Sequence, residues 1–580
     1  MAKEDNQVMK HLDILCNRFG GRVAGSDAYE NAAEWAIQCF EKWGLEVTTE
    51  EAGQTSVGFN RGGWWGYQTG EEQHTLHFVT PSYTSGTKGP QKGHVVIEPR
   101  TAEQVARVKH LLKGSWVLLN GHNRGWSFGY GPWWDNKRKE IIAANAEAEK
   151  WNRQHAGEDG ERKPIDDDTA PLFYNEMVEA GILGFVQKGT TPLTALYDRD
   201  VIGHNIPFDS LPTVPNIILD EYQFDHIYRM AKERRHVELN FDIRNHFKLG
   251  PVKYHNIIAT IKGSKYPDEY VLVGAHLDAF DVATGGVDCG SGVSVVMEAA
   301  RMISQSGAKP ERTIVFILFA AEEFGLIGSQ AWLKAHPDKA DKISNMFNRD
   351  GGPMPYTSFS APKSLVKEYE KIAEPIQELY PDYNFTIREL EPRQKPTELG
   401  GNDASTFAVA GIPALQMSEW TDVKGYGFSY GEIWHTERDT YQKSIPEYQE
   451  QAATAMALMV LGTANLSKKL PREEDAVVHA SGIHGGGEGA RDLQRTGGKH
   501  GVVQLLPPVI VLAVAIVVPI LIAHGSGLGV VRQELARSVL IAIVDRGVDI
   551  LVGRLAALFR GGNLHRGNGM VIDKGHRRII

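Results

Sequence analysis

Two short apolar runs, residues 271–275 and 313–321, constrain the fold of this chain more than any other feature. Both are rich in Val, Ile and Phe and are bounded by polar residues, which is typical of buried parallel strands. In open α/β sheets, functional groups gather at the carboxyl ends of the strands. The pattern therefore predicts an α/β fold with a site at that edge of the sheet. The side chains that follow the two runs are His276, Asp278, Glu322 and Glu323.

A glycine-rich turn lies between the two runs. Asp288 precedes Gly290-Ser291-Gly292, and this turn opens an apolar helical pattern that extends to about residue 303. His, Asp and Glu side chains that converge from several strand ends are the donors that a zinc site needs. The sequence thus indicates a metal site built by residues far apart in the chain.

Five motifs, in this order, resemble those of the co-catalytic dizinc exopeptidases of metallopeptidase family twenty-eight. The motifs are His276-x-Asp278, Asp288-x-Gly-Ser-Gly292, Glu322-Glu323, Asn348-Arg349-Asp350 and the segment from Trp434 and His435 to Asp439 and Thr440. The resemblance covers residues 1–469. It implies a mixed sheet flanked by helices, with a small inserted α/β domain.

The resemblance also implies two zinc ions per chain and a ligand set for each. Asp288 is the predicted bridging carboxylate. His276 and Asp350 complete the ligands of one ion, and Glu323 and His435 complete those of the other. A two-metal hydrolase requires this combination of a shared ligand and terminal ligands.

Glu322 and Asp278 are the predicted catalytic residues. Glu322 is expected to act as the general base that takes a proton from a water bridging the two zinc ions and passes it to the leaving amine. Asp278, two residues past His276, suits a partner that orients the imidazole and fixes its tautomer. Neighbouring glutamates on a strand face opposite ways, so Glu322 and Glu323 are expected in a turn or at a helix start. Cys289 stands where the family usually has Asp or Asn, and an extra soft ligand is the alternative to a structural thiol.

The predicted function is a metal-dependent exopeptidase that hydrolyses peptides at a chain terminus, with an aminopeptidase as the first choice. A carboxypeptidase or dipeptidase of the same family stays open. So do a glutaminyl-cyclase-like acyl transferase with one zinc and a non-catalytic receptor-like module. A non-catalytic module would have lost ligands or base, and none is lost here. The expected partner is a peptide substrate, and a homodimer remains open.

The predicted domain organisation is discontinuous. Residues 1–74 and 251–469 are assigned to the peptidase domain, and residues 75–250 to an insert that is similar to the protease-associated domain. The aromatic stretch 126–134 is expected to pack the insert onto the main domain, with a substrate pocket as the alternative. Residues 256–261 are expected to form an edge strand.

The N-terminal segment and the composition add smaller expectations. Residues 5–19 and 26–43 are predicted amphipathic helices, Ser26 is a predicted N-cap, and Arg22 a structural turn residue. Apolar residues make up 42% and charged residues 23%, as in soluble globular proteins. A net charge of −10 argues against a nucleic-acid partner. Three cysteines cannot form a disulfide framework, and Cys16 and Cys39 are expected as buried thiols.

Residues 470–580 depart from the family pattern. Within them, residues 505–523 form an apolar run long enough to span a bilayer, although it holds three prolines. Three interpretations compete: a C-terminal membrane anchor, a buried or aggregated hairpin, and translation of sequence never selected as protein. The chain opens with polar residues and shows no secretory signal. The family resemblance implies a secreted or periplasmic protein, so the localisation stays open.

Overall fold

The computed structural model describes residues 1–472 except 157–159, 161, 164, 166–169, 392–393, 420–422, 424 and 426–428. The chain divides into two units, residues 1–496 and 497–580, and the fold below is that of the described residues of the first. The apolar run 505–523 and its three interpretations lie outside the described residues. Within the part of the chain that is described, no helix has both the length and the apolar character needed to cross a membrane.

A five-stranded mixed sheet forms the centre of the peptidase fold. In spatial order its strands are β1 (Glu46–Asn60), β10 (His246–Ile261), β12 (Arg312–Phe319), β11 (Tyr266–His276) and β13 (Ile343–Asn348). β11 runs parallel to β12 and β13, so the carboxyl ends of these three strands meet at one edge. The two apolar runs are therefore neighbouring parallel strands. The expectation of an edge strand at residues 256–261 is wrong, because β1 pairs with β10 and continues the sheet beyond it.

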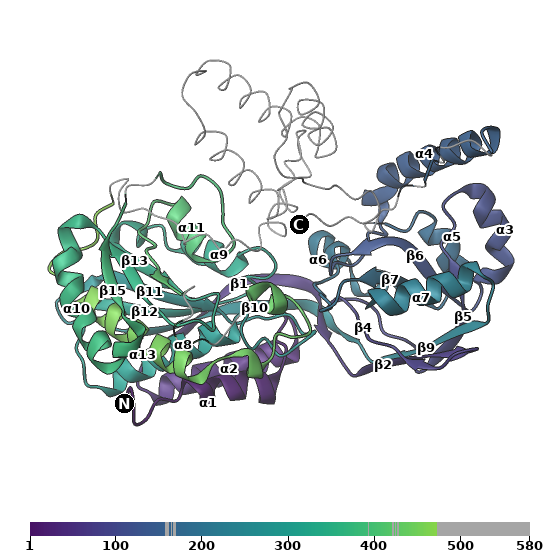
Figure 1. Cartoon of the computed structure of the whole chain (residues 1–580). Helices are drawn as coiled ribbons and strands as arrows, with labels where there is room; N and C mark the ends of the chain where they lie inside the picture. Colours follow the sequence, from purple (N-terminus) through teal and green to yellow (C-terminus); the bar gives the residue numbers. More distant parts are fainter. Residues whose placement is uncertain are drawn as a thin grey trace, which may run out of the picture. The chain divides into compact units, whose positions relative to one another are not determined.

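Helices cover both faces of this sheet (Figure 1). Successive residues of a strand point to opposite faces, and β12 shows it: Phe316 joins the larger core, whereas Val315 packs with Trp332. On the larger-core face lie α1 (Val8–Ile14), α2 (Asp27–Lys42), α8 (Gly290–Gln305) and α13 (Pro446–Ala464). On the other face lie α9 (Ile327–Ala335) and α11 (Ala404–Val409). A mixed sheet between helices confirms the predicted fold class.

One helix cap and one buried arginine fix the N-terminal segment to this core. The Ser26 hydroxyl accepts a hydrogen bond from the Tyr29 N–H at 3.1 Å, so it caps α2 as predicted. Arg22 is fully buried and donates to the carbonyl oxygens of Leu277 (3.0 Å) and Thr284 (2.9 Å). It is the structural turn residue that the sequence indicated. The helix predicted at residues 5–19 continues from α1 as a π-helix, Leu15–Phe19.

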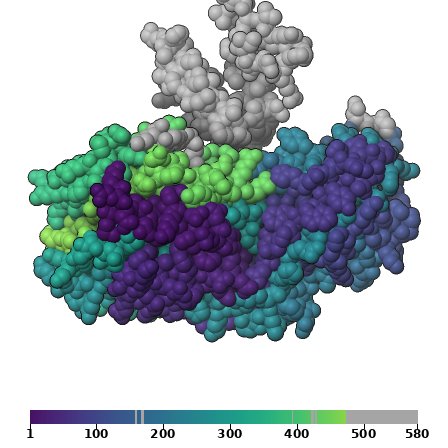
Figure 2. Space-filling view, turned by 90° about the horizontal axis from the view of Figure 1, so that it is seen from below, coloured from purple at the N-terminus to yellow at the C-terminus, as the bar shows by residue number. Residues whose placement is uncertain are grey.

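The N-terminal helices and α13 share one surface of the molecule. In Figure 2 the purple N-terminal residues lie beside the green C-terminal part of the peptidase fold. The Asn6 side-chain amide donates to the carbonyl oxygen of Glu450 on α13 at 3.3 Å. Cys16 is buried as expected, but Cys39 is only half-buried, because it lies toward the solvent side of α2.

An eight-stranded sheet forms the insert. Its strands, in spatial order, are β3 (His74–Thr75), β2 (Trp64–Gly70), β9 (Val237–Ile243), β5 (Gln91–Ile97), β6 (Ser115–Asn123), β7 (Gly184–Gly189), β8 (Asn216–Asp220) and β4 (Phe78–Val79). β2 pairs with β9, so the predicted boundaries of 75–250 divide this sheet. The insert sheet extends from residue 64 to residue 243 instead.

The remaining elements are short or peripheral. The insert helices are α3 (Ala102–Leu112), α4 (Asp135–Gln154), α5 (Tyr174–Glu179), α6 (Arg199–His204) and α7 (Glu221–Lys232). The peptidase part adds α10 (Val366–Leu379), α12 (Tyr430–Ile433) and a small sheet of β15 (Thr386–Glu389), β14 (Ser358–Ala361) and β16 (Met417–Ser418). Single 3-10 turns lie at Pro132–Trp134, Phe208–Ser210, Ala340–Lys342, Lys363–Leu365, Pro381–Tyr383 and Tyr441–Lys443.

The aromatic stretch 126–134 packs against the rest of the protein. The ring of Trp126 meets that of Tyr197 edge-on, with 4.9 Å between centroids, and both rings belong to the main core. The Trp134 indole N–H donates to Asp200 Oδ1 at 3.0 Å. Tyr197 and Asp200 belong to the insert themselves, and Tyr130 and Trp133 line a cavity with other insert residues, so the expected packing of this stretch onto the main domain stays a prediction.

Candidate metal centre

His276 stands at the carboxyl end of β11 and is fully buried. Its Nδ1 lies 2.8 Å from the carbonyl oxygen of Asp278. A carbonyl oxygen only accepts hydrogen bonds, so Nδ1 carries the proton. Nε2 is then unprotonated and faces the centre with its lone pair. Nε2 lies 3.2 Å from Asp288 Oδ1 and 3.2 Å from Asp350 Oδ1. The imidazole of His276 thus has a fixed tautomer and contacts two carboxylates at the end of β11.

The Asp278 carboxylate lies beside the imidazole that it is predicted to orient, and its hydrogen bonds go to a neighbouring turn. Its Oδ1 is 3.7 Å from His276 Nδ1, and the backbone carbonyl of Asp278 makes the hydrogen bond to the imidazole. The two carboxylate oxygens instead accept the N–H groups of Glu322 and Glu323, each at 3.1 Å. Asp278 therefore orients His276 through its main chain and holds the glutamate turn through its side chain.

Asp288 lies between the two imidazoles of the centre. Its Oδ1 is 3.2 Å from His276 Nε2, and its Oδ2 is 3.3 Å from His435 Nε2. Each oxygen thus faces a different histidine, which is the arrangement a bridging carboxylate requires. The Asp288 loop is fixed by Asp439, whose carboxylate accepts the N–H groups of Val287 (2.7 Å) and Asp288 (3.2 Å).

Asp439 is a functional residue to which the sequence patterns assign no separate role. Its place in the closing motif is the one sequence signal for Asp439, because the loop that its carboxylate holds lies 152 residues earlier in the chain. In the structure it is buried, with 5% of its surface exposed. Burial and the nearby Asp288 carboxylate raise its pKa to about 8.

The two glutamates follow β12 in a turn, as expected. Ala321 adopts a φ of +53° at the start of this turn, and the turn sends the two side chains to different partners. Glu323 Oε2 is 3.0 Å from His435 Nε2, whereas its Oε1 is buried without a hydrogen-bond partner. Among the described residues, none makes a hydrogen bond to the Glu322 carboxylate. Burial raises the pKa of Glu322 well above its usual value.

Asp350 enters the centre from the segment after β13, beside a buried arginine. Arg349 Nη1 donates to Glu419 Oε2 at 2.6 Å, and Nη2 donates to the carbonyl oxygen of Met354 at 2.9 Å. The Cys289 thiol donates to the Arg349 carbonyl oxygen at 3.1 Å, and burial raises the pKa of this thiol to about 12. Cys289 lies close enough to His276 and Asp350 to share an ion, but its hydrogen bond favours the structural role.

The donor set fits divalent metal ions. Buried carboxylates outnumber the imidazoles, and burial raises the pKa of Glu323 and of Asp403 to about 7. Both oxygens of Asp403 and Oε1 of Glu323 are buried without partners. Burial lowers the pKa of His435, but Glu323 and Asp288 together raise it to about 10. Such a surplus of acid calls for cations, and imidazole nitrogen with carboxylate oxygen is a donor set that zinc accepts.

A narrow, mostly polar crevice adjoins the centre. The Phe280 ring meets His435 edge-on, with 4.7 Å between centroids. The lining consists of Phe280, Val282, Asp288, Glu323, His435, Thr436 and Asp439. Phe280 and Val282 are its two apolar members, and they lie beside the two imidazole-facing acids.

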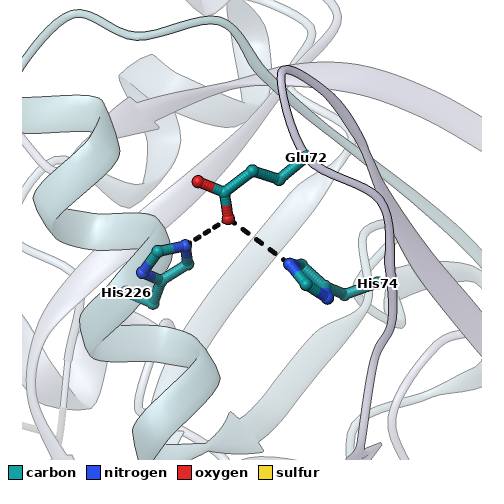
Figure 3. A group of neighbouring side chains, drawn as sticks. All are labelled: Glu72, His74 and His226. Carbon is teal, nitrogen blue, oxygen red and sulfur yellow. Dashed lines mark hydrogen bonds and ion pairs between the residues drawn. The ribbon is translucent and has the colours of Figure 1, made fainter.

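A second histidine and carboxylate cluster lies away from this centre. Glu72, His74 and His226 converge on the insert (Figure 3). The sequence analysis missed this cluster, because Glu72-x-His74 has no family motif and His226 stands alone on a helix.

The sheet brings two imidazoles and several buried acids to one strand-end edge, and these are donor groups that could hold a metal ion. Residues 256–461 match the model of peptidase family M28. Rat carboxypeptidase Q is 27% identical over 274 residues, 46% of this chain and 52% of that protein, so this match spans about half of the relative. Mouse carboxypeptidase Q is 26% identical over 491 residues, which cover 81% of this chain and 88% of that protein.

A solved structure supports the same fold. The peptidase M28 precursor from Shewanella amazonensis SB2B superimposes with a TM-score of 0.51 at 22% identity, covering 81% of this chain and 96% of that one. Residues 256–461 of this chain are thus similar to peptidase family M28, and the solved structure shares the fold.

Proposed function

We propose that this protein is a dizinc aminopeptidase that removes residues from the amino terminus of peptides. The observation that carries the proposal is the charge of the centre. The side chains that line its cavity include three acids and, among the described residues, neither lysine nor arginine. Zinc ions would balance the charges of Asp288 and Glu323, but this lining would still offer no cation to a free α-carboxylate, whereas a free amine needs none.

The nearby arginines support the same reading. A carboxypeptidase needs a cation that can receive the terminal carboxylate, usually in a bidentate pair. Arg22 and Arg349 are fully buried and are held by carbonyl oxygens and by Glu419. Both guanidinium groups are already hydrogen-bonded inside the protein. Neither can therefore bind the carboxylate of a substrate.

The proposed ligand roles follow the geometry. Asp288 would be the ligand shared by two zinc ions, His276 and Asp350 would complete the ligands of one ion, and Glu323 and His435 would complete those of the other. Zinc ions at these places would supply Lewis-acid activation of water and of the scissile carbonyl. Glu322 takes the proton from the attacking water and returns it to the leaving amine, a role open to it because its carboxylate makes no hydrogen bond to the described residues.

Asp278 and Asp439 act by positioning. Asp278 fixes the turn that carries both glutamates, and Asp439 fixes the loop that carries Asp288. Phe280 and Val282 are apolar residues that lie beside the predicted metal ligands. We infer that amino termini with an apolar first residue, such as leucine, are the preferred substrates.

A panel of substrates tests the proposal. The zinc-loaded protein should hydrolyse leucine p-nitroanilide, and acetylation of the leucine amine should lower kcat/KM by at least about a hundredfold, because the charged amine is lost. Preferential cleavage of an acetylated dipeptide with a free carboxylate would instead show a carboxypeptidase, the activity named in the mouse relative. Cleavage that requires both free termini would show a dipeptidase.

The glutaminyl-cyclase-like alternative predicts a different outcome. It requires one zinc ion per chain and release of ammonia from amino-terminal glutamine. Two ions and hydrolysis without that release would argue against it. A receptor-like module would bind peptides without turning over any substrate of the panel.

A further inference from the structure

The cluster on the insert brings three donor atoms to one point. Glu72 Oε2 lies 2.6 Å from His226 Nε2 and 3.3 Å from His74 Nε2 (Figure 3). The three atoms all lie within 4.8 Å of one another. Glu72 and His74 belong to the turn and strand that follow β2, whereas His226 belongs to α7. The cluster therefore joins two elements that are distant in sequence.

The turn that carries Glu72 is fixed by its neighbours. Gly70 has a φ of +113°, and a Cβ atom at this position would lie 2.3 Å from the His236 carbonyl oxygen, so the turn requires glycine. Glu71 Oε1 accepts the His236 N–H at 3.0 Å. Arg235 Nη2 donates to Glu72 Oε1 at 2.8 Å, so only Oε2 faces the two imidazoles. The hydrogen bonds from His226 and Arg235 lower the pKa of Glu72 to about 2, which keeps the carboxylate ionised.

The spacing resembles that of the catalytic centre. There, imidazole and carboxylate atoms lie 3.0–3.3 Å apart, and here they lie 2.6–3.3 Å apart. Two imidazole nitrogens and one carboxylate oxygen form a donor set that suits zinc, with a fourth position left for water. The Arg235 hydrogen bond to the second oxygen of Glu72 would orient that ligand.

We propose that Glu72, His74 and His226 bind a divalent transition-metal ion, with Zn²⁺ as the best fit, at a site on the insert separate from the catalytic centre. The ion would replace the proton shared by Glu72 and His226. It would tie the turn after β2 to α7.

Arg229 competes with the ion. Its Nη2 lies 3.0 Å from His226 Nδ1, and because a guanidinium only donates, Nδ1 accepts and Nε2 carries the proton. Metal binding at Nε2 requires the opposite tautomer, with the proton on Nδ1. The exposed Arg229 side chain must therefore turn away when the ion binds.

Calorimetric titration with zinc chloride tests the proposal. The protein is first saturated with zinc at the catalytic centre and then freed of excess metal. One further ion per chain is expected, and His226→Ala or Glu72→Gln should weaken its binding at least about tenfold, which is 1.4 kcal/mol. Arg229→Gln should tighten it by about two- to fivefold, the size of a removed surface charge interaction.

His236→Ala is the matched control, because this histidine is exposed and its ring lies 3.9 Å from Glu238 rather than at the cluster. It should leave the further ion in place. Leucine p-nitroanilide hydrolysis should be unchanged in every variant, which shows that each variant is folded. No further ion, or an ion retained by both His226→Ala and Glu72→Gln, would overturn the proposal. Weaker binding in Arg229→Gln would overturn the competition.

Discussion

At the scale of single residues, two acids shape the centre by accepting hydrogen bonds from backbone N–H groups. Asp278 holds the turn of Glu322 and Glu323, and Asp439 holds the loop of Asp288. A carboxylate that accepts two such bonds fixes a ligand more precisely than rotamer preference alone can. Asp278 and Asp439, which are not predicted ligands themselves, thus set the positions of the predicted metal ligands.

Glu322→Gln should separate catalysis from metal binding. The amide cannot take a proton from water, and none of the described residues depends on this carboxylate for a hydrogen bond. Turnover should fall by about 10²–10⁴-fold, while metal analysis still finds the zinc content of the wild type. Near-wild-type turnover in the metal-loaded variant would contradict the assignment.

Asp288→Ala and His435→Ala should differ in how many ions they lose. Asp288 faces both imidazoles, so its loss should release both zinc ions. His435 faces only Asp288 and Glu323, so its loss should leave the site of His276 and Asp350 partly filled. Cys289→Ser should keep both ions, since its thiol is bonded to a carbonyl.

Metal analysis after gel filtration distinguishes these variants. Two tightly bound ions in Asp288→Ala, together with none in His435→Ala, would show that the bridge is elsewhere. A mononuclear centre would then bring the cyclase-like function forward.

At the scale of elements, α1 and α8 are joined by one buried carboxylate. Glu298 on α8 is fully buried and accepts from the Gln7 N–H (2.9 Å), from Arg301 Nε (2.8 Å) and from His11 Nε2 (3.0 Å). Burial raises the pKa of Glu298, but the bonds from Arg301 and His11 lower it more, so its net shift is downward.

Glu298→Gln should lower the free energy of unfolding by about 1–3 kcal/mol at pH 7, because Arg301 keeps its ion pair with Asp5 but loses the charge of Glu298. A folded-state pKa below the unfolded value stabilises the protein above the unfolded pKa of 4.5. That contribution is lost as the pH falls through the folded pKa, so the two proteins should converge below about pH 4.5.

Urea unfolding at several pH values measures this difference. Glu41→Gln is the control, since this glutamate is exposed on α2. Equal losses at pH 7 and at low pH would show that the charge of Glu298 is not what stabilises the pair of helices.

At the scale of the whole molecule, the peptidase fold extends past the predicted boundary at residue 469. Leu470 is 3% exposed, and its N–H donates to Ser344 Oγ at 3.2 Å. Arg472 Nη2 donates to the Ile343 carbonyl oxygen at 2.9 Å. These residues cover the start of β13, so the segment to residue 472 belongs to the fold.

Leu470→Ala should therefore destabilise the full chain by about 2–5 kcal/mol, the cost of emptying a buried leucine site. Thermal unfolding followed by circular dichroism measures the loss. The exposed Lys468→Ala is the matched control and should be within about 0.5 kcal/mol of the wild type. An equal effect of both substitutions would place Leu470 outside the core.

The insert contacts the peptidase part beside the metal centre. His77 Nε2 lies 2.7 Å from Glu437 Oε2, two residues after His435. Thr194 and Thr436 form an isolated bridge between the two parts. The insert thus supports the segment that carries one of the two histidines.

The sequence by itself determined the elements and the identity of the chemical groups. The two apolar runs predict β11 and β12, because the pattern of a strand is local. The acids and the histidine that follow these strands can be identified from the same short stretches. Ser26, Arg22 and the glutamate turn were equally local. Each depends on residues within a few positions, so composition and spacing are enough to predict it.

Only the tertiary structure decided how these groups meet. It gave Asp278 its two N–H groups, placed Asp439 under Asp288, and put β2 in the insert and β10 inside the central sheet. It also brought His226 to Glu72 from 154 positions away. Strand pairing and buried hydrogen bonds join distant parts of the chain, and neither periodicity nor motif spacing encodes which partner is chosen.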